Sequence, residues 1–291
     1  MPILEQKPNT KPCTSLFEDL LQIPEATLTN IDSFKDRYLG VALKSLYAKH
    51  PELREDIDAE LENAISNRKN DKVQRLIEDA NLPLYPNHYK LSDFDPSCLK
   101  EEERKTYNEL ITLDFMTSDC PNVTLYGPRT FGAEEIASGL GDALCNKLYT
   151  VSYIKYDYLI EMLKSHTVNT SMNKLYDKLL KQDCLIIERF TKQHIVDRDL
   201  LSVLCTFLDT RISNHRNSFS KAIKSGIGHF KPSATIVTTG RDYDEWYTTF
   251  DCDYENATSI IALFHGYGCK LEVDSGKAQE NPTEPSSSPD E

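Results

Sequence analysis

The stretch that decides the fold is Leu125–Glu135, "LYGPRTFGAEE". An apolar run enters Gly127, four residues follow, and a helical pattern begins after Gly132. A phosphate-binding loop reads G-x-x-x-x-G-K-[S/T] between a strand and a helix. The glycine spacing matches that loop, but Ala133 stands at the lysine position and Glu134 at the hydroxyl position. The stretch is therefore either a nucleotide loop with altered chemistry or a chance pair of glycines. The pattern of strands and helices around it distinguishes the two alternatives.

Apolar strands alternate with amphipathic helices around this stretch, from about residue 101 onward. Such alternation indicates an α/β fold with a mainly parallel sheet covered by helices on both faces. The predicted strands are 122–127, 148–154, 183–188, 234–239 and 269–273. The predicted helices are 101–117, 133–147, 156–165, 173–182 and 198–213, with two short helices after 239.

The chain divides into three parts by pattern. Residues 1–82 predict an N-terminal helical domain: 1–14 are expected to be unstructured, and helical periodicity from about 15 to 80 predicts separate helices at about 33–50, 52–66 and 71–80. The α/β domain is predicted over 83–274 and starts with a linker or extended arm, since 81–97 contains three prolines. The polar, acidic, Pro- and Ser-rich segment 275–291 predicts a disordered tail.

Composition excludes several classes of protein. A net charge of −13 over 291 residues argues against non-specific binding of nucleic acid or anionic membrane across the whole surface. No apolar run approaches the roughly 18 residues of a membrane span, and the first residues lack the apolar core of a signal peptide. The eight cysteines form no C-x-x-C pair and the histidines have no metal-site spacing. We therefore predict a cytoplasmic protein with reduced thiols, no metal and no membrane contact.

Four segments in a fixed order carry a resemblance to a known family. They are "LYPNHYKLSDFDPS" (84–97), "GPRTFGAEEIASGLGDAL" (127–144), "LIIER" (185–189) and "TIVTTGRDYDEWYTTF" (235–250). In order and spacing they resemble the IstB/DnaC-like branch of the AAA+ ATPases, the helper ATPases of certain transposons and the loaders of replicative helicases. The transposon-helper branch fits better, and the match covers about residues 80–275. The resemblance implies an AAA+, P-loop NTPase-like parallel sheet flanked by helices.

The resemblance also implies a nucleotide site, and the chain departs from the family at most of its positions. Ala133 replaces the lysine that reaches the β- and γ-phosphates, and Glu134 replaces the hydroxyl that holds Mg²⁺. Glu188 replaces the Mg²⁺-holding Asp, while Arg189 replaces the catalytic Glu and cannot serve as a base. The positions carried over are Gly127, Pro128, Arg129, Thr130, Phe131, Gly132, Ala133, Glu134, Glu188, Arg189 and Gly240.

Three further departures point the same way. Thr130 and Phe131 narrow the loop where the family has Gly and Thr, and Gly240 replaces an Asn after the fourth strand. The family supplies an arginine finger from a helix near the C-terminus, but no arginine follows Arg241. We also expect the acids in the first turn after Gly132 to fill the anion site of that helix. The sequence predicts no catalytic residue and no cofactor, with ATP and Mg²⁺ bound only if the altered loop still binds.

One basic stretch stands against the acidic balance. No acidic residue occurs between Thr210 and Arg241, and about 216–230 is predicted to be an inserted loop. Such a basic loop is typical of contact with a phosphate backbone or an acidic partner, although a solvated loop is the alternative. The candidate contact residues are Arg211, Arg216, Lys221, Lys224 and Lys231.

Other residues in this half of the chain carry weaker predictions. We expect His215 to be a solvated surface residue and Trp246 to pack in the core. A second group of lysines, at 164, 174, 178 and 181, is diluted by neighbouring acids, so we predict no DNA contact through it.

Three functions remain open at this point. The leading hypothesis is a non-hydrolysing binding or regulatory partner in DNA transposition or replicative-helicase loading, acting with an AAA+ subunit, a transposase or a helicase. The alternatives are an active DNA-stimulated ATPase with atypical site residues, and a structural or interaction protein that kept only the fold. A protein partner is expected under the first, with DNA contact through the local basic loop.

Overall fold

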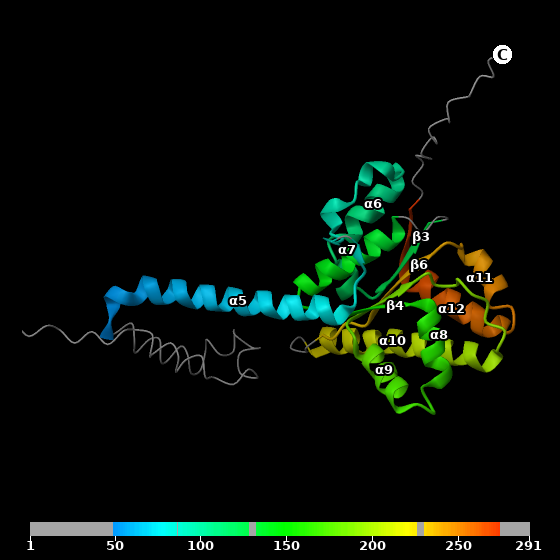
Figure 1. The fold of residues 1–291 in the computed structure, drawn as a ribbon. Coiled ribbons are helices and arrows are strands. Elements are labelled where there is room, and N and C mark those ends of the chain that lie inside the picture. The colour runs from blue at the N-terminus through cyan, green and yellow to red at the C-terminus, as the bar shows by residue number, and fades with distance from the viewer. Residues whose placement is uncertain (1–48, 86, 128–131, 226–229, 274–291) are drawn as a thin grey trace, which may run out of the picture. The chain divides into compact units, whose positions relative to one another are not determined.

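The computed structural model describes residues 49–85, 87–127, 132–225 and 230–273. The chain separates into two compact units, 1–68 and 69–291, and the account below concerns the larger one unless stated. The predicted domain boundary at 82/83 lies C-terminal to this division. Most of the predicted helix at 33–50 lies outside the described residues. The segment 1–14 and the whole of the predicted tail at 275–291 also lie outside them. The elements in Figure 1 are α5 (Arg54–Ala80), β1 (Leu84–Tyr85), β2 (Asn87–His88), α6 (Glu101–Leu110), β3 (Asn122–Tyr126), α7 (Ala133–Asn146), β4 (Val151–Lys155), α8 (Tyr156–Ser165), α9 (Thr170–Lys181), β5 (Cys184–Glu188), α10 (Arg198–Ser225), β6 (Ala234–Thr239), α11 (Tyr243–Thr249), α12 (Tyr254–Gly266) and β7 (Gly268–Glu272).

The centre of the fold is a five-stranded sheet in the order β4-β5-β6-β3-β7. Every neighbouring pair of strands runs parallel, for example Val123 beside Ile236 and Cys269. Strands β3, β4, β5 and β6 contain five or six residues each, and their aliphatic side chains are almost fully buried, as a sheet covered on both faces requires. The predicted parallel α/β sheet is confirmed.

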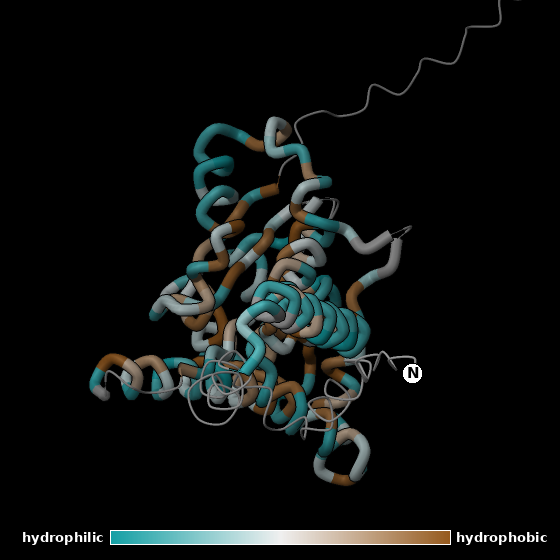
Figure 2. Tube along the Cα trace, turned by 90° about the vertical axis from the view of Figure 1, so that its left-hand side faces the viewer, coloured by the Kyte–Doolittle hydropathy of each residue, from teal (hydrophilic) through white to brown (hydrophobic). Residues whose placement is uncertain are grey.

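Side chains alternate between two cores along β4, β5 and β6, whereas the buried apolar side chains of β3 and β7 belong to one of them. Val123, Leu125 and Ile186 belong to the core under α7, together with the C-terminal end of α5 and with α6. Ile187 and Val237 belong to the second core, which α8 to α12 cover. Figure 2 shows the strands as mainly hydrophobic and the exposed turns of α5 as mainly hydrophilic. The sheet is therefore the middle layer of three.

Trp246 packs in the second core, as predicted. It is 0% exposed. Its ring centroid lies 5.0 Å from that of Phe190 and 5.6 Å from that of Phe264. Its indole N–H donates to the Arg241 carbonyl at 3.0 Å, so the one polar atom of the ring is satisfied.

The predicted linker or extended arm at 81–97 lies in a packed segment, 81–99, so the linker alternative is wrong, while its short strands agree with the extended one. Short strands β1 and β2 pair antiparallel, and two 3-10 turns follow at Leu91–Asp93 and Pro96–Cys98. Its apolar side chains Leu82, Phe94 and Leu99 are buried in the core beneath α7. The prolines break the helical pattern, but the spacing of these apolar residues anchors the segment.

Two helices are longer than predicted. One continuous helix, α5, replaces the two expected at 52–66 and 71–80, because the polar stretch between them contains no proline or glycine. In the same way α10 runs on to Ser225, so much of the predicted basic loop at 216–230 is helical. Within the described ranges, no helix combines the length and the apolar character needed to cross a membrane.

Candidate functional site at the carboxyl end of the sheet

The carboxyl ends of β3, β5 and β6 bring the predicted site positions to one edge of the sheet. Gly127 follows β3, Glu188 ends β5 and Gly240 follows β6, and these strands are neighbours or next neighbours in the sheet. In open parallel sheets, ligands bind outside the carboxyl ends of the strands. The fold thus gathers at a ligand-binding edge residues that are far apart in sequence.

Both glycines of the opening stretch are required by close contact with the end of β7. A Cβ on Gly127 would lie 3.0 Å from the Val273 carbonyl oxygen. A Cβ on Gly132 would lie 2.7 Å from Val273 Cγ1, and Gly132 has a φ of +88°, which disfavours any side chain. Four predicted site residues, Pro128, Arg129, Thr130 and Phe131, lie outside the described residues.

The first turn of α7 supplies a methyl group and two carboxylates where the family supplies a cation and a hydroxyl. Ala133 is 0% exposed and contributes no charge. Glu134 and Glu135 follow it in the first turn, where the helix dipole favours negative charge. The expected filling of this helix end by acids agrees with that placement.

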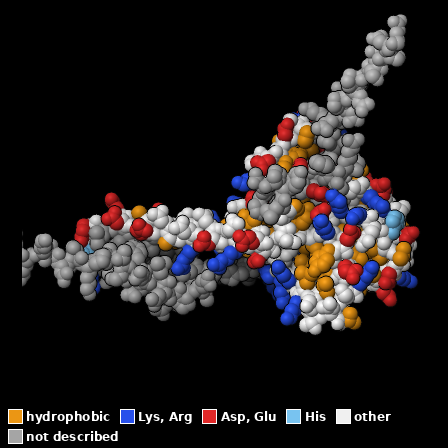
Figure 3. Space-filling model, in the orientation of Figure 1, with side chains coloured by type: hydrophobic (Ala, Val, Ile, Leu, Met, Phe, Trp, Pro, Cys, Tyr) orange, Lys and Arg blue, Asp and Glu red, His pale blue; other side chains and the backbone are white. Residues whose placement is uncertain are grey.

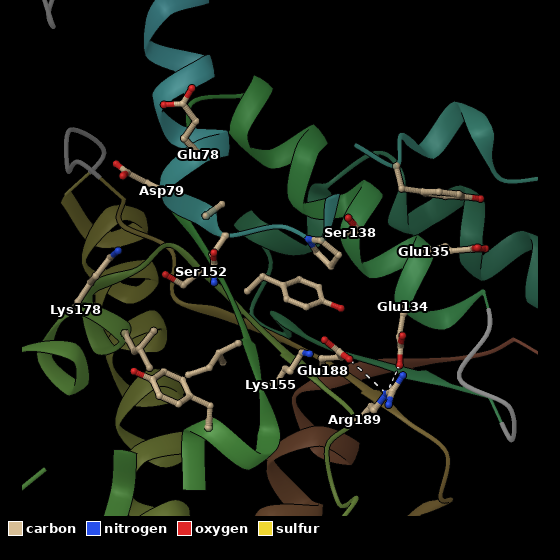
Figure 4. Close-up of a pocket in the computed structure, with 18 of the residues that line it drawn as sticks. Glu78, Asp79, Glu134, Glu135, Ser138, Ser152, Lys155, Lys178, Glu188 and Arg189 are labelled. Atoms are coloured by element: carbon tan, nitrogen blue, oxygen red, sulfur yellow. Dashed lines mark hydrogen bonds and ion pairs between the residues drawn. The ribbon is translucent and has the colours of Figure 1, made fainter. Parts of the chain in front are cut away.

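Glu134 forms an ion pair with Arg189, across 55 residues of sequence (Figure 4). Arg189 Nε donates to Glu134 Oε1 at 2.7 Å and lies 3.4 Å from Glu188 Oε1. The pair raises the pKa of the Arg189 guanidinium, first through the hydrogen bond to Glu134, so the arginine stays charged. Two departures from the family pattern, at the hydroxyl and the catalytic positions, are thus each other's partners.

Backbone contacts fix Arg189 in an unusual conformation. Its φ is 56°, in the left-handed region that costs a non-glycine residue free energy. The Arg189 N–H donates to Thr238 Oγ1 at 2.9 Å, and the Phe190 N–H donates to the Thr238 carbonyl at 2.7 Å. Phe190 is 1% exposed and anchors the turn in the second core. The turn after β5 is therefore held on both sides while it directs Arg189 toward Glu134.

The carboxylates at this edge crowd one another. Glu188 is 7% exposed, and its pKa is raised, first by burial and then by the charge of Glu134. Tyr153 on β4 has a raised pKa, first by burial and then by Glu188 and Glu134. Lys155 and Arg189 oppose the raised pKa of Glu188, and Arg189 opposes that of Tyr153.

The residues at this edge do not fit ATP with Mg²⁺ held in the family's manner. No lysine reaches the γ-phosphate from position 133, and the Glu134 carboxylate that replaces the metal-binding hydroxyl is already bonded to Arg189. Arg189 also cannot orient an attacking water as a base. Gly240, exposed after β6, offers no side chain in place of the family's Asn.

This edge opens into a cavity of about 1000 Å³. Its walls are the start of α7, strand β4, the ends of α5 and β5, and part of α9, all within the larger unit. Residues that the sequence did not single out line it: Glu78, Asp79, Ser138 and Tyr153. In the sequence these residues share only one feature: each is a polar residue on an otherwise apolar element or at a helix end. That feature is too common to identify pocket residues from the sequence alone.

Arg211 lies in the interior, which corrects its predicted contact with DNA or a partner. It is 0% exposed, and its guanidinium donates to the carbonyls of Leu179, Gln182 and Ala234 and to Thr235 Oγ1. Burial lowers its pKa to about 10, so it remains charged at neutral pH. It joins α9 and α10 to the start of β6.

His215 is also buried, which corrects the prediction of a solvated residue. Its Nε2–H donates to the Ser118 carbonyl at 2.7 Å, and its Nδ1 accepts from the Ser233 N–H at 3.1 Å. The ring is 0% exposed and therefore bonds only to backbone groups just before β3 and β6.

The remaining basic candidates divide between a helix and a groove. Arg216 stacks over the Tyr267 ring at 4.8 Å, and Lys221 and Lys224 lie exposed on α10. Lys231 lines a shallow groove of about 510 Å³ that also contains Lys178 and Lys181 of α9. On the face drawn in Figure 3, basic side chains occur in separate groups with acidic ones between them.

Comparison with solved structures finds distant likenesses. DnaI is 15% identical, with a TM-score of 0.49, over 63% of this chain and 89% of that one. The DnaC helicase loader is 14% identical, with a TM-score of 0.44, over 63% of this chain and 96% of that one. AMPPCP-bound DnaA from Aquifex aeolicus is 15% identical, with a TM-score of 0.47, over 66% of this chain and 51% of that one. Likenesses this distant say nothing about what this chain binds.

Comparison with curated proteins finds no significant match. A family model does match: the one described as "IstB-like ATP binding protein" covers residues 46–277. That range includes the sheet, both loop glycines and the altered positions at 133, 134, 188 and 189. Since the match spans well over half of the chain and confirms the resemblance seen in the four sequence segments, this protein belongs to the family of IstB-like ATP-binding proteins.

Proposed function

We propose that this protein is a non-hydrolysing member of its family, a binding or regulatory partner in DNA transposition or replicative-helicase loading. The observation that carries the proposal is the Glu134–Arg189 ion pair at 2.7 Å. A carboxylate occupies the place of the metal-binding hydroxyl, and the arginine that replaces the catalytic base holds it there.

Electrostatics support the loss of nucleotide binding. A phosphate beside Glu134 would meet a like charge, and two unit charges about 4 Å apart interact by roughly 1 to 4 kcal/mol at effective dielectrics of 80 to 20. The lysine that offsets this repulsion in a working loop is the buried methyl group of Ala133. Arg189 offsets part of the charge of Glu134, but no cation stands at position 133, where the family places its lysine.

The expected partners follow from the family residues that this chain lacks. With no arginine after Arg241, the chain supplies no finger from its C-terminal helices to a neighbouring subunit. It would act by docking, with a protein partner such as an active AAA+ subunit, a transposase or a helicase. The exposed lysines of α10 and the groove at Lys231 offer a local DNA contact on an acidic protein.

Titration calorimetry with ATP and ADP, with and without Mg²⁺, tests the proposal directly. We expect no binding heat at millimolar nucleotide and no hydrolysis, with or without DNA. Hydrolysis that DNA stimulates and that Glu188→Gln abolishes would instead establish an active ATPase with atypical residues. As a gain-of-function arm, Ala133→Lys with Glu134→Thr restores the family's residues and should create nucleotide binding; a melting curve checks that this variant folds.

A DNA-binding assay over a range of salt separates a DNA-linked role from an interaction protein that kept only the fold. We expect Lys221→Gln with Lys224→Gln to weaken binding and to reduce the salt slope by about one per lysine. The matched control, Lys164→Gln with Lys174→Gln, removes the same charge from exposed positions on α8 and α9. Absence of DNA binding by the unaltered protein would favour the interaction protein.

A further inference from the structure

The cavity at the carboxyl end of the sheet is lined by an excess of negative charge. Five carboxylates line it against three cationic side chains, and we call it the acidic pocket. Arg189 is already bonded to one of these carboxylates and in ion-pair contact with a second. The carboxylates are Glu78, Asp79, Glu134, Glu135 and Glu188, and the cations are Lys155, Lys178 and Arg189.

The carboxylates form two groups at separate ends of the pocket (Figure 4). Glu134 and Glu188 lie at the end beside Arg189, Glu135 follows Glu134 on α7, and Glu78 and Asp79 lie at the end formed by α5. The side chains of Ser138 and Ser152 lie between the two groups (Figure 4). An elongated ligand could therefore place a positive group at each end.

The α5 end is unfavourable for carboxylates in the protein alone. The C-terminus of a helix carries partial negative charge, and it favours basic side chains in the last turn. The last turn of α5 contains no basic residue and instead presents Glu78 and Asp79 just before the helix ends at Ala80. Among the described residues, neither carboxylate forms an ion pair. A bound cation would offset both the side chains and the helix end.

A buried hydroxyl in the pocket wall also lacks a partner. Ser138 on α7 is 3% exposed, and its Oγ makes no hydrogen bond within the described part of the chain. An unmade hydrogen bond at a buried hydroxyl is unfavourable. The Tyr153 hydroxyl is likewise buried beside Glu188, with no hydrogen bond of normal geometry to a described residue. Both hydroxyls can accept a hydrogen bond from an N–H donor on a ligand.

Aromatic rings complete the lining. Tyr89 and Tyr158 face the pocket, and a tyrosine ring attracts a cation placed over its face. The pKa of Tyr89 is raised to about 12, first by burial and then by the charge of Glu135.

We propose that the acidic pocket binds an elongated organic cation with amino or guanidino groups at both ends, one held at Glu134, Glu135 and Glu188 and the other at Glu78 and Asp79. The inference rests on the proposed function, since the pocket includes the edge where the family binds a nucleotide. The site that takes an anion in the family takes a cation in this chain.

Calorimetry of the full chain with spermidine tests the proposal, with ATP titrated separately. We expect saturable 1:1 binding of spermidine. Glu78→Gln with Asp79→Asn should weaken it at least fivefold. The matched control, Glu101→Gln with Glu102→Gln, removes the same charge from two consecutive exposed residues on α6 and should change affinity less than twofold. Equal affinity in both variants would overturn the proposal, because attraction to the net charge alone would explain the binding.

Ser138→Ala provides a second, independent variant. It should weaken spermidine binding a few-fold while leaving the melting temperature unchanged or raised, because the hydroxyl has no partner in the described structure. A lower melting temperature with unchanged affinity would show that the hydroxyl serves the fold and not a ligand.

A second titrant distinguishes the sources of the cation. A short peptide with two separated lysines presents the same amino groups as a partner protein would, and tighter binding of the peptide than of spermidine would assign the pocket to a partner's side chains. If neither probe binds, the proposal fails. Binding of ATP with Mg²⁺ would overturn the proposed function, whereas absence of binding by both cationic probes overturns the cation site. The two failures are therefore distinguishable.

Discussion

The two ends of the sheet satisfy their ionisable side chains in different ways. At the amino end, Arg211 and His215 are 0% exposed and bond almost entirely to backbone carbonyls and N–H groups. At the carboxyl end, Glu134, Glu188 and Arg189 instead form ion pairs with one another. Unpartnered buried polar atoms occur at both ends among the described residues, such as Ser233 Oγ at the amino end and Ser138 Oγ at the carboxyl end, so the contrast lies in the ionisable groups.

The difference separates residues that hold the fold from residues available to a ligand. A buried polar group bonded to backbone stabilises the chain that surrounds it and has no spare capacity. A cluster of like charges costs stability, and such local conflicts are expected at functional sites. The comparison leads to three tests in order of expected effect on the free energy of unfolding.

Arg211→Ala should have the largest effect. It leaves three buried carbonyls without their donor and opens a cavity, so we expect the free energy of unfolding to fall by about 3 kcal/mol or more. Urea denaturation followed by circular dichroism measures the loss. Arg189→Ala is the control at the other end, where the half-exposed side chain should cost about 1 kcal/mol or less. Equal losses would contradict the distinction between the two ends.

His215 should make stability depend on pH. Burial, chiefly, and the charge of Arg211 lower its pKa, against the opposing effects of the Ser118 carbonyl and Asp119. The unfolded chain then binds the proton more readily, so stability is complete above the unfolded pKa of about 6.5 and is lost as pH falls below it. We expect His215→Gln to cost about 1–2 kcal/mol at pH 7.5.

The same variant should show a weaker fall in stability between pH 7.5 and 5 than the unaltered protein. Urea midpoints at several pH values measure both slopes. Identical slopes would mean that protonation of this ring does not oppose folding.

The Glu134–Arg189 pair should have the smallest effect. Its side chains are 26% and 48% exposed, so solvent screens the attraction. A double-mutant cycle with Glu134→Gln and Arg189→Met should give a coupling of about 0.5–1 kcal/mol. The pair Lys192–Asp157, at 2.7 Å and 53% and 46% exposed, is a matched control with an expected coupling at or below that value. A coupling of zero for Glu134 and Arg189 would remove the support that their pairing gives to the proposed function.

Much of the fold could be predicted from sequence because buried parallel strands are short apolar runs. The strand at 234–239 agrees with β6 at both ends, and the helix at 156–165 agrees with α8. The helix ends of α5 and α10 could not be predicted so well, since polar residues with moderate helix propensity neither favour nor forbid continuation. The packed segment at 81–99 was missed because prolines hide the role of Leu82, Phe94 and Leu99.

The site was predictable in position but not in its pairing. The spacing of Gly127 and Gly132 located the edge, and each altered residue could be read as a loss. That Glu134 and Arg189 compensate each other depends on parallel strands that bring distant residues together, which sequence distance conceals. The burial of Arg211 and His215 conflicts with what their polar character predicts. Their helical spacing after Leu204 and Leu208 is the signal that places them on the buried stripe of α10.

The contacts of Val273, just after β7, with the end of β3 constrain the order in which the sheet can assemble. The first strand of the sheet, β3, has the last one, β7, as its neighbour, and Gly268 pairs with Asn122. Only after β7 has left the ribosome can Val273 cover Gly127 and Gly132 and close the hydrogen bond to the Tyr126 carbonyl at 2.6 Å. About half of the chain lies between Gly127 and Val273, so during synthesis one side of β3 stays unpaired while that half is translated.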